Sequence, residues 1–226
     1  MAETTEKQRS RALSYLLTPL LLLILCAGIL VLCYALMPSH KLEKYLNIAF
    51  MDTQRTPSAT AGLHIVEKDI PTEPENGQTY EQGEVTYPKF GEQFATLRCE
   101  PIDPYVGVYF GTNSELLSRG ACMSTQSAVP GTGGNTVIDA HVNTFFADLS
   151  KMQVGDEVTV YTSYGKFVYE AEEAIRFEKT NKKYLQVTND DVLTLYTCAP
   201  QVIGSSNTRV GMRCRLVSQE FYNAAE

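Results

Sequence analysis

The sequence predicts an all-β domain that closes into a barrel, preceded by a transmembrane helix. Three observations predict this architecture. From Glu84 onward, short runs of apolar and β-branched residues alternate with turns, a spacing typical of barrels. The chain has 13 Tyr and no Trp, which suits a β-rich domain. Residues 12–40 contain no Asp, Glu, Lys or Arg, and their core exceeds the ~20 residues that span a bilayer as a helix.

The apolar segment divides the chain into four parts. We expect a cytoplasmic terminus at 1–11, a transmembrane anchor at 12–37, an extracellular linker at 38–83 and the barrel domain at 84–226. Lys7, Arg9 and Arg11 precede the anchor, and this charge bias predicts a single-pass protein with a cytoplasmic N-terminus. A cleaved signal peptide is the alternative, but the apolar run is long for one. The linker is polar and contains several prolines, although it could also pack as an arm on the domain.

The pattern of the barrel domain places its elements by residue range. Period-2 alternation and flanking turns predict strands, and Asn113 is a candidate N-cap for a short helix. We expect strands at 94–99, 106–110, 137–138, 157–162, 167–171, 184–187, 192–197 and 209–217, and short helical turns at 114–117 and 144–149.

Charge and cysteine usage exclude several function classes. The net charge of -7 argues against nucleic acid as a partner. The cysteines lack the paired spacing of a zinc site, so we expect neither a metal nor a cofactor. Cys99, Cys122 and Cys214 are expected to be buried small side chains, with a disulfide among them as the alternative.

Cys198 is the candidate nucleophile because it ends an apolar strand, where a sheet can hold a thiol rigidly at a cleft. A thiol needs an acid–base partner, and beyond the anchor the chain offers His64, in the linker, and His141. Arg209 begins the next strand, where its guanidinium could stabilise an oxyanion. Arg213 and Arg215 share the face of that strand, and Gly211 suggests a bulge or a close approach.

Several motifs, in this order along the chain, resemble those of the sortases, the cysteine transpeptidases of Gram-positive cell surfaces. TLYTC at 194–198 resembles their TLxTC active-site motif. PGTGGNTVIDAH at 130–141 resembles their glycine-rich turn and histidine strand. FFADL at 145–149 and VGDE at 154–157 resemble the segments after the sortase histidine, and NTR at 207–209 resembles the pilus-type pattern. Ala140 stands where many sortases have glycine.

The resemblance implies the eight-stranded sortase β-barrel and an enzyme that is a cysteine transpeptidase or endopeptidase. Cys198 would attack an LPxTG-like sorting signal of a secreted protein and form a thioacyl enzyme. His141 would act as acid and base, and Arg209 would hold the substrate and the oxyanion. The acceptor would be an amine, from the cell-wall cross-bridge or from a pilin lysine. The subclass stays open between pilus-type and class D-like.

Thr197, Asn135 and Thr194 are secondary candidates for substrate binding; alternatively they form hydrogen bonds within turns and the sheet. An L,D-transpeptidase is a rival function, but that family has an SHGC-like motif at its nucleophile, and the residues around Cys198 lack it. A non-catalytic, membrane-tethered β-barrel binding module is the rival from another class, and selective alkylation of Cys198 separates it from an enzyme.

Overall fold

The structure, a computed structural model, describes residues 22–23, 25–29, 65–200 and 206–225. The chain divides into two compact units, Met1–Leu46 and Asn47–Glu226. In the first unit the described residues are helical and exposed. Within the described ranges, no helix combines the length and the apolar character needed to cross a bilayer. The expected cytoplasmic terminus at 1–11 lies outside the described residues, and so does most of the expected anchor at 12–37.

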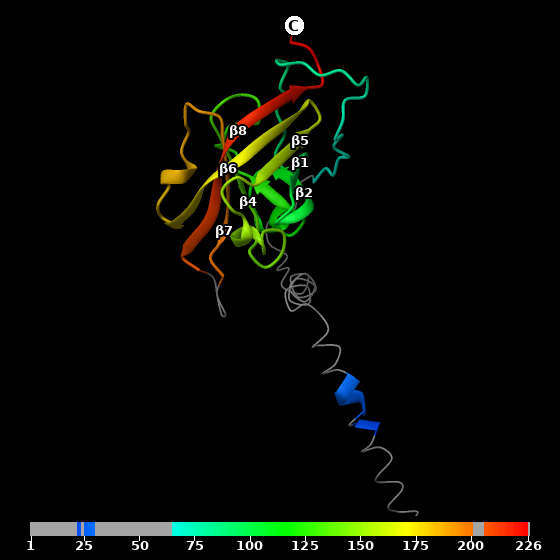
Figure 1. Cartoon of the computed structure of the whole chain (residues 1–226), viewed down its shortest axis with the longest axis vertical. Coiled ribbons are helices and arrows are strands. Elements are labelled where there is room, and N and C mark those ends of the chain that lie inside the picture. The colour runs from blue at the N-terminus through cyan, green and yellow to red at the C-terminus, as the bar shows by residue number, and fades with distance from the viewer. Residues whose placement is uncertain (1–21, 24, 30–64, 201–205, 226) are drawn as a thin grey trace, which may run out of the picture. The chain divides into compact units, whose positions relative to one another are not determined.

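The second unit contains a closed barrel of eight strands, as the sequence analysis expects. Around the barrel the strands follow the order β1-β2-β3-β4-β7-β8-β6-β5, and most of them are visible in Figure 1. Their bounds are β1 Gln93–Cys99, β2 Asp103–Phe110, β3 Ala121–Met123, β4 Asn135–Asp139, β5 Glu157–Thr162, β6 Gly165–Glu178, β7 Val192–Cys198 and β8 Thr208–Phe221. Helix α3 (Ser114–Leu117) and the 3-10 helices η2 (Leu149–Lys151) and η3 (Lys183–Leu185) lie in the connections.

Two neighbouring pairs of strands are parallel, β2 with β3 and β4 with β7, and the other pairs are antiparallel. Parallel strands need a long crossover between them, and residues 140–191, including β5 and β6, form the connection from β4 to β7. The topology therefore brings together the ends of β4, β7 and β8, which are far apart in sequence.

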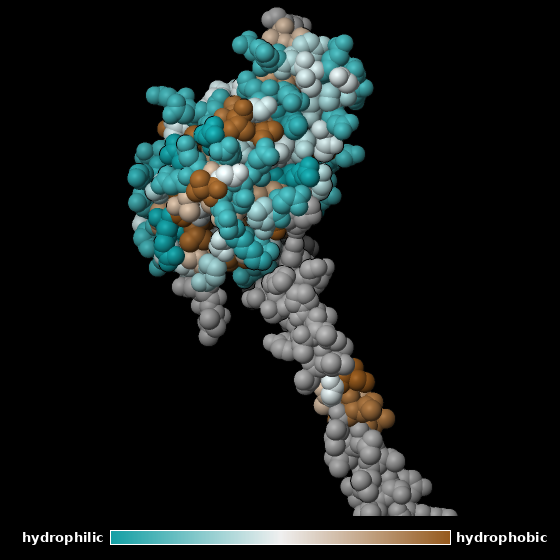
Figure 2. All heavy atoms as spheres, viewed as in Figure 1, coloured by the Kyte–Doolittle hydropathy of each residue, from teal (hydrophilic) through white to brown (hydrophobic). Residues whose placement is uncertain are grey.

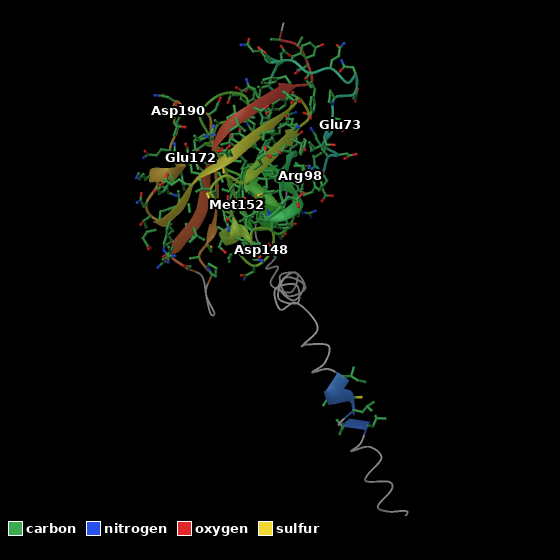
Figure 3. All side chains as sticks on the ribbon, viewed as in Figure 1. Glu73, Arg98, Asp148, Met152, Glu172 and Asp190 are labelled. Atoms are coloured by element: carbon green, nitrogen blue, oxygen red, sulfur yellow. The ribbon has the colours of Figure 1, made fainter. Side chains whose placement is uncertain are left out.

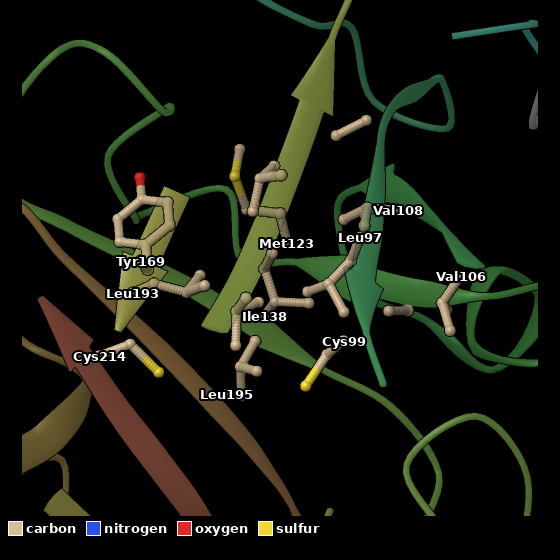
Figure 4. Close-up of a cluster of buried hydrophobic side chains, with 14 of the residues drawn as sticks. Leu97, Cys99, Val106, Val108, Met123, Ile138, Tyr169, Leu193, Leu195 and Cys214 are labelled. Atoms are coloured by element: carbon tan, nitrogen blue, oxygen red, sulfur yellow. The ribbon is translucent and has the colours of Figure 1, made fainter. Parts of the chain in front are cut away.

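Apolar side chains fill the barrel because every second residue of a strand points inward. Leu193 and Leu195 of β7 are fully buried beside Ile138 of β4, and Figure 4 shows these side chains meeting Leu97 and Met123 between the strands. The face of the domain in Figure 2 is mostly hydrophilic, with apolar side chains in small separate patches. This alternation leaves Tyr196 and Cys198 on the outer face of β7.

Three expectations about the elements need correction. Residues 184–187 are not a strand, because the Nδ2 of Asn135 binds the carbonyl oxygens of Tyr184 and Gln186 at 2.9 and 3.0 Å. The carbonyls are thereby taken by a side chain; residues 184 and 185 belong to η3, whereas 186 and 187 have no regular structure. Strand β3 was not expected, because three residues are too few to show a period of two. Strands β6 and β8 have 14 residues each and extend beyond their expected ends at residues 171 and 217.

Residues 65–83, which we expected to belong to a linker, pack on the barrel as an arm. Val66 pairs with Glu92, and Tyr80 pairs with Phe221 through backbone hydrogen bonds of 2.9 and 2.8 Å. Ile70 is buried. Figure 3 shows Glu73, on this arm, on the opposite side of the barrel from Asp190 in the β6–β7 connection. Of the two expected arrangements, the packed arm therefore describes residues 65–83, while residues 38–64 lie outside the described ranges.

Candidate active site

The parallel register of β4 and β7 brings His141 beside Cys198. Asn135 pairs with Val192 and Asp139 with Tyr196, at a constant offset along the two strands. Continued by two residues, this register aligns His141 with Cys198. The hydroxyl of Thr197 donates a hydrogen bond of 2.7 Å to the carbonyl oxygen of Ala140. That bond holds the two strand ends together where the imidazole and the thiol emerge.

The antiparallel register of β7 and β8 places Arg209 directly opposite Cys198. Because opposed residues of an antiparallel pair point to the same face, the guanidinium and the thiol share the outer face of the barrel. Their pairing runs from Val192↔Arg215 to Cys198↔Arg209 without a register shift. The structure thus brings His141, Cys198 and Arg209, all predicted from the sequence, to one end of three adjacent strands.

Gly211 makes the close contact between β7 and β8 possible. It lies opposite Tyr196, and a Cβ at this position would be 2.0 Å from the carbonyl oxygen of Leu195. No side chain fits at such a distance. Of the two explanations offered for this glycine, close approach is confirmed, and the pairing of β7 with β8 has no bulge there.

The guanidinium of Arg209 is held by carbonyl groups of its own chain segment. Its Nη1 donates to the carbonyl oxygens of Ser206 at 2.7 Å and Thr208 at 3.3 Å. The ring of Phe177, which lies opposite Arg209 on β6, packs against that of Tyr196 with centroids 5.7 Å apart. The guanidinium of Arg209 is therefore held by hydrogen bonds to its own chain segment, and two packed aromatic rings lie on the neighbouring strands.

Burial controls the protonation of the groups around the thiol. Burial lowers the pKa of His141 below its ordinary value of 6.5, so the imidazole is mostly neutral at pH 7. Burial also raises the pKa of Cys99, to about 12, and that of Cys122 and Cys214. Cys198 is half-buried, whereas these three cysteines are buried and free. In the barrel, Cys198 is thus the cysteine best placed to meet a reagent or a substrate.

Asn135 and Thr194, expected as substrate-binding candidates, form a buried pair away from Cys198. The hydroxyl of Thr194 donates to Oδ1 of Asn135 at 2.8 Å, and Asn135 in turn binds the backbone of η3. Both side chains are almost completely buried. Their hydrogen bonds attach the β6–β7 connection to the sheet. Thr197 lies next to Cys198, but its hydroxyl donates a hydrogen bond to the carbonyl oxygen of Ala140.

Asp139 also belongs to this site, although no sequence motif pointed to it. This residue ends β4, lies opposite Tyr196 and accepts a 3.3 Å hydrogen bond from the hydroxyl of Thr112. Burial raises its pKa to about 6, an effect that the hydrogen bond from Thr112 and, to a smaller extent, the positive charge of Arg209 partly offset. A signal was available: because Ile138 is apolar and points inward, alternation places Asp139 on the face of His141.

The described residues contain no group of three or more His, Cys, Asp or Glu that could hold a metal ion. The chemistry available at the strand ends is that of a thiol, an imidazole and a guanidinium. Such a set can support nucleophilic attack on a carbonyl, proton transfer and stabilisation of an oxyanion.

Comparison with known proteins identifies the family. Residues 97–217 match the family model of the sortase domain, which is more than half of the chain, and the protein belongs to the sortase family. Sortase D from Bacillus subtilis (strain 168) is 25% identical over 114 residues, which are 50% of this chain and 58% of that protein. The match thus covers less than two thirds of this relative's length.

Solved sortase structures share the fold. A sortase D5 transpeptidase from Clostridium perfringens has a TM-score of 0.53 and 24% identity, with 57% of this chain and 82% of that chain covered. Sortase A from Corynebacterium diphtheriae has a TM-score of 0.52 and 26% identity, with 55% of this chain and 60% of that chain covered. Sortase C1 from Streptococcus agalactiae gives 0.52 and 26%, over 57% and 70%.

Proposed function

We propose that this sortase is a membrane-anchored cysteine transpeptidase. It cleaves an LPxTG-like sorting signal of a secreted protein after the threonine and joins the new carboxyl end to an amine. The carrying observation is the convergence of His141, Cys198 and Arg209 at one end of β4, β7 and β8. The registers support this proposal directly for Cys198 and Arg209, which are paired on β7 and β8, while His141 follows two residues after the end of β4.

The first half of the reaction forms a thioester. The thiol proton of Cys198 passes to the imidazole of His141, and the sulfur bonds to the threonine carbonyl carbon. Arg209 stabilises the negative oxygen of the tetrahedral intermediate by charge and hydrogen bonding. The carbon–nitrogen bond then breaks, and the imidazolium gives its proton to the leaving amine.

The second half transfers the acyl group. An incoming amine attacks the thioester carbon and loses a proton to His141. The carbon–sulfur bond breaks, and the thiolate of Cys198 recovers that proton. Because burial lowers the pKa of His141, the imidazole is mostly neutral at pH 7 and is free to accept a proton. The amine belongs to a cell-wall cross-bridge or to a pilin lysine.

The proposed location is the cell membrane, with residues 1–11 in the cytoplasm, 12–37 across the bilayer and the barrel outside. The uncharged stretch at 12–40 and the basic residues before it support this topology. Protease added to intact cells should remove the barrel and leave an N-terminal tag protected. Digestion of the tag, or full protection of the barrel from the protease, would contradict this membrane topology.

The reaction is tested on the full-length chain in detergent. Quenched fluorescent peptides with LPxTG-like sequences are incubated with and without triglycine or a lysine-containing peptide, and products are followed by mass spectrometry. We expect cleavage after threonine, transfer to the amine and loss of both in Cys198→Ala. Cys26→Ala is the matched control, because it removes another cysteine that is exposed but lies outside the barrel, and it should retain activity.

The outcomes distinguish the rival functions. Cleavage without transfer makes the protein an endopeptidase. No cleavage, together with no preferential alkylation of Cys198 in the Cys26→Ala chain, supports a non-catalytic binding module instead. Preference for triglycine or for the lysine peptide indicates which kind of amine the enzyme uses.

A further inference from the structure

Asp139 lies on the same face of the sheet as His141, Cys198 and Arg209. It is one cross-strand pair further from the strand ends that carry them. It is two residues before His141, and its partner on β7, Tyr196, is two residues before Cys198. Tyr196 in turn lies opposite Gly211, two residues after Arg209. Because alternate residues of a strand share a face, the carboxylate points to the surface from which the thiol emerges.

The surroundings of Asp139 combine one hydrogen bond with one positive charge. Thr112, after β2, donates to its Oδ1 at 3.3 Å. The titratable and charged groups that face it are Cys122 on β3, Tyr196 on β7, Arg209 on β8 and, at the end of its own strand, His141. Arg209 favours the ionised form of the carboxyl, and burial opposes that form. An asparagine could accept the same hydrogen bond, so the hydrogen bond alone does not explain the acid.

The order of the strands determines the direction in which the Asp139 carboxylate attracts the Arg209 guanidinium. Strand β7 lies between β4, which carries Asp139, and β8, which carries Arg209. An attraction between the carboxylate and the guanidinium therefore draws the arginine side chain across β7, at the level of Cys198. Gly211 has no side chain on this path, the ring of Tyr196 lies beside it and packs against Phe177, and Nη1 of Arg209 is held by the carbonyl oxygens of Ser206 and Thr208.

We propose that Asp139 is a positioning residue that holds the guanidinium of Arg209 over Cys198. The inference rests on the proposed function of Cys198 and Arg209. Asp139 touches neither thiol nor substrate in this role; its negative charge keeps the arginine directed toward the position of the oxyanion. The role belongs to the ionised carboxylate.

The test compares Asp139→Asn with Asp191→Asn in the full-length chain. Asparagine keeps an oxygen for Thr112 and removes the charge. Asp191 is the matched control, because it is a partly buried acid just before β7, at the end opposite Cys198. At pH 7.5 we expect kcat/KM of Asp139→Asn to fall about tenfold, mainly in kcat, since a misdirected arginine weakens the transition state. Asp191→Asn should stay within about twofold of the native chain.

The pH dependence separates a charge effect from a structural one. The pKa of Asp139 is about 6, so the native chain loses this charge as the pH falls to 5. The ratio of native to Asp139→Asn activity should then shrink from about tenfold toward one. His141 titrates in both chains, so its midpoint is measured by NMR in each and the ratio is corrected for any difference between them. A ratio that stays constant from pH 5 to pH 8, or no loss at pH 7.5, would overturn the inference.

A measurement without substrate keeps the two proposals separate. NMR of the carboxyl carbons should show Asp139 titrating near pH 6, and its pKa should rise further in Arg209→Gln, because the cation that favours the carboxylate is gone. An unchanged pKa in Arg209→Gln refutes the pairing even if no peptide is cleaved. If the native chain is an active transpeptidase and only these Asp139 results fail, the inference fails alone.

Discussion

Cys198 and Arg209 lie directly opposite each other where β7 pairs with β8, and Gly211 makes that pairing sterically possible two residues further along β8. The backbone position of the arginine relative to the thiol is therefore set by the register of the sheet. A loop-borne arginine would depend on loop order. Here the backbone hydrogen bonds of two strands fix it, so the arginines of β8 can be compared position by position.

We predict that Arg209→Gln lowers kcat/KM on an LPxTG-like peptide by about a hundredfold, because it removes a charged donor from the oxyanion. Arg213→Gln is the matched control. Arg213 lies on the same face of β8 but opposite Thr194, four residues before Cys198. The kcat/KM of Arg213→Gln should stay within about threefold of the native value. Equal losses in the two variants would show that overall positive charge, rather than the position of Arg209, supports the reaction.

Gly211→Ala should destabilise the domain and disable the site together. The added methyl group would collide with the backbone of Leu195 and Tyr196, and backbone atoms cannot move aside as a flexible side chain can. We expect the free energy of unfolding to fall by about 3 kcal/mol, measured by urea denaturation. A stable and fully active variant would show that β7 and β8 tolerate a wider separation at this point.

His141 should titrate below pH 6.5. Burial is the cause of its lowered pKa, and burial persists in Cys198→Ala, so the midpoint should change little in that variant. Since the folded-state value lies below the unfolded one, this group's contribution to stability is present above pH 6.5 and is lost as the pH falls through the folded value. NMR titration of the imidazole protons, assigned with His141→Gln, gives the midpoint. A midpoint at or above 6.5 contradicts the prediction.

Asp139→Asn should make the protein more stable at pH 7. The pKa of Asp139 is about 6 in the folded chain against an ordinary value of 3.8, so the folded state binds this proton more tightly than the unfolded state. Stability therefore decreases as the pH rises from about 4 to about 6, and the full cost remains above that range. The variant should gain up to about 3 kcal/mol at pH 7.

Urea denaturation of both chains at pH 4 and pH 7 checks this prediction. The gain should be largely absent at pH 4, where most of the acid is protonated in the folded chain. Equal gains at the two pH values would mean that the side-chain amide packs better for reasons unrelated to charge. A loss at pH 7 would mean that the pair with Arg209 outweighs the burial of Asp139.

A chain that begins at Glu84 should be less stable than one that begins at Asn47. The shorter chain lacks buried Ile70 and the two hydrogen bonds between Tyr80 and Phe221. It also lacks the ion pair between Lys68 and Glu92, which is partly exposed and contributes little. We expect a loss on the order of 3 kcal/mol from burial and hydrogen bonding. Equal melting temperatures would show that the arm does not stabilise the barrel.

Much of the fold is predictable from the sequence because barrel strands carry local signals. Strand β5 has the predicted bounds, and β1 and β7 differ from them by one residue at one end. The false strand at 184–187 has a nonlocal cause: the amide that binds its carbonyls belongs to Asn135, about 50 residues earlier. The docking of Ile70 and Tyr80 is likewise invisible in the pattern of a polar, proline-containing segment.

The site divides in the same way. Cys198, His141 and Arg209 stand in recognisable motifs; β-sheet register pairs Cys198 with Arg209, and His141 follows the end of the neighbouring strand β4. Asp139 carries no motif of its own, and its significance depends on a neighbour from another strand. The functional assignment of Asn135 and Thr194 followed from their place in motifs, whereas their hydrogen bonds attach the β6–β7 connection to the sheet.

The attachment of η3 has a consequence for how the sequence of this sortase could diversify. Asn135 holds the connection through the carbonyl oxygens of Tyr184 and Gln186, groups that every amino acid possesses. Substitutions at residues 179–183 and 187–190 can therefore accumulate while the anchoring bonds persist. Gene duplication followed by substitution at these positions would yield paralogues that share the barrel and differ in the surface of the β6–β7 connection. Exchanging this connection between such paralogues should preserve folding.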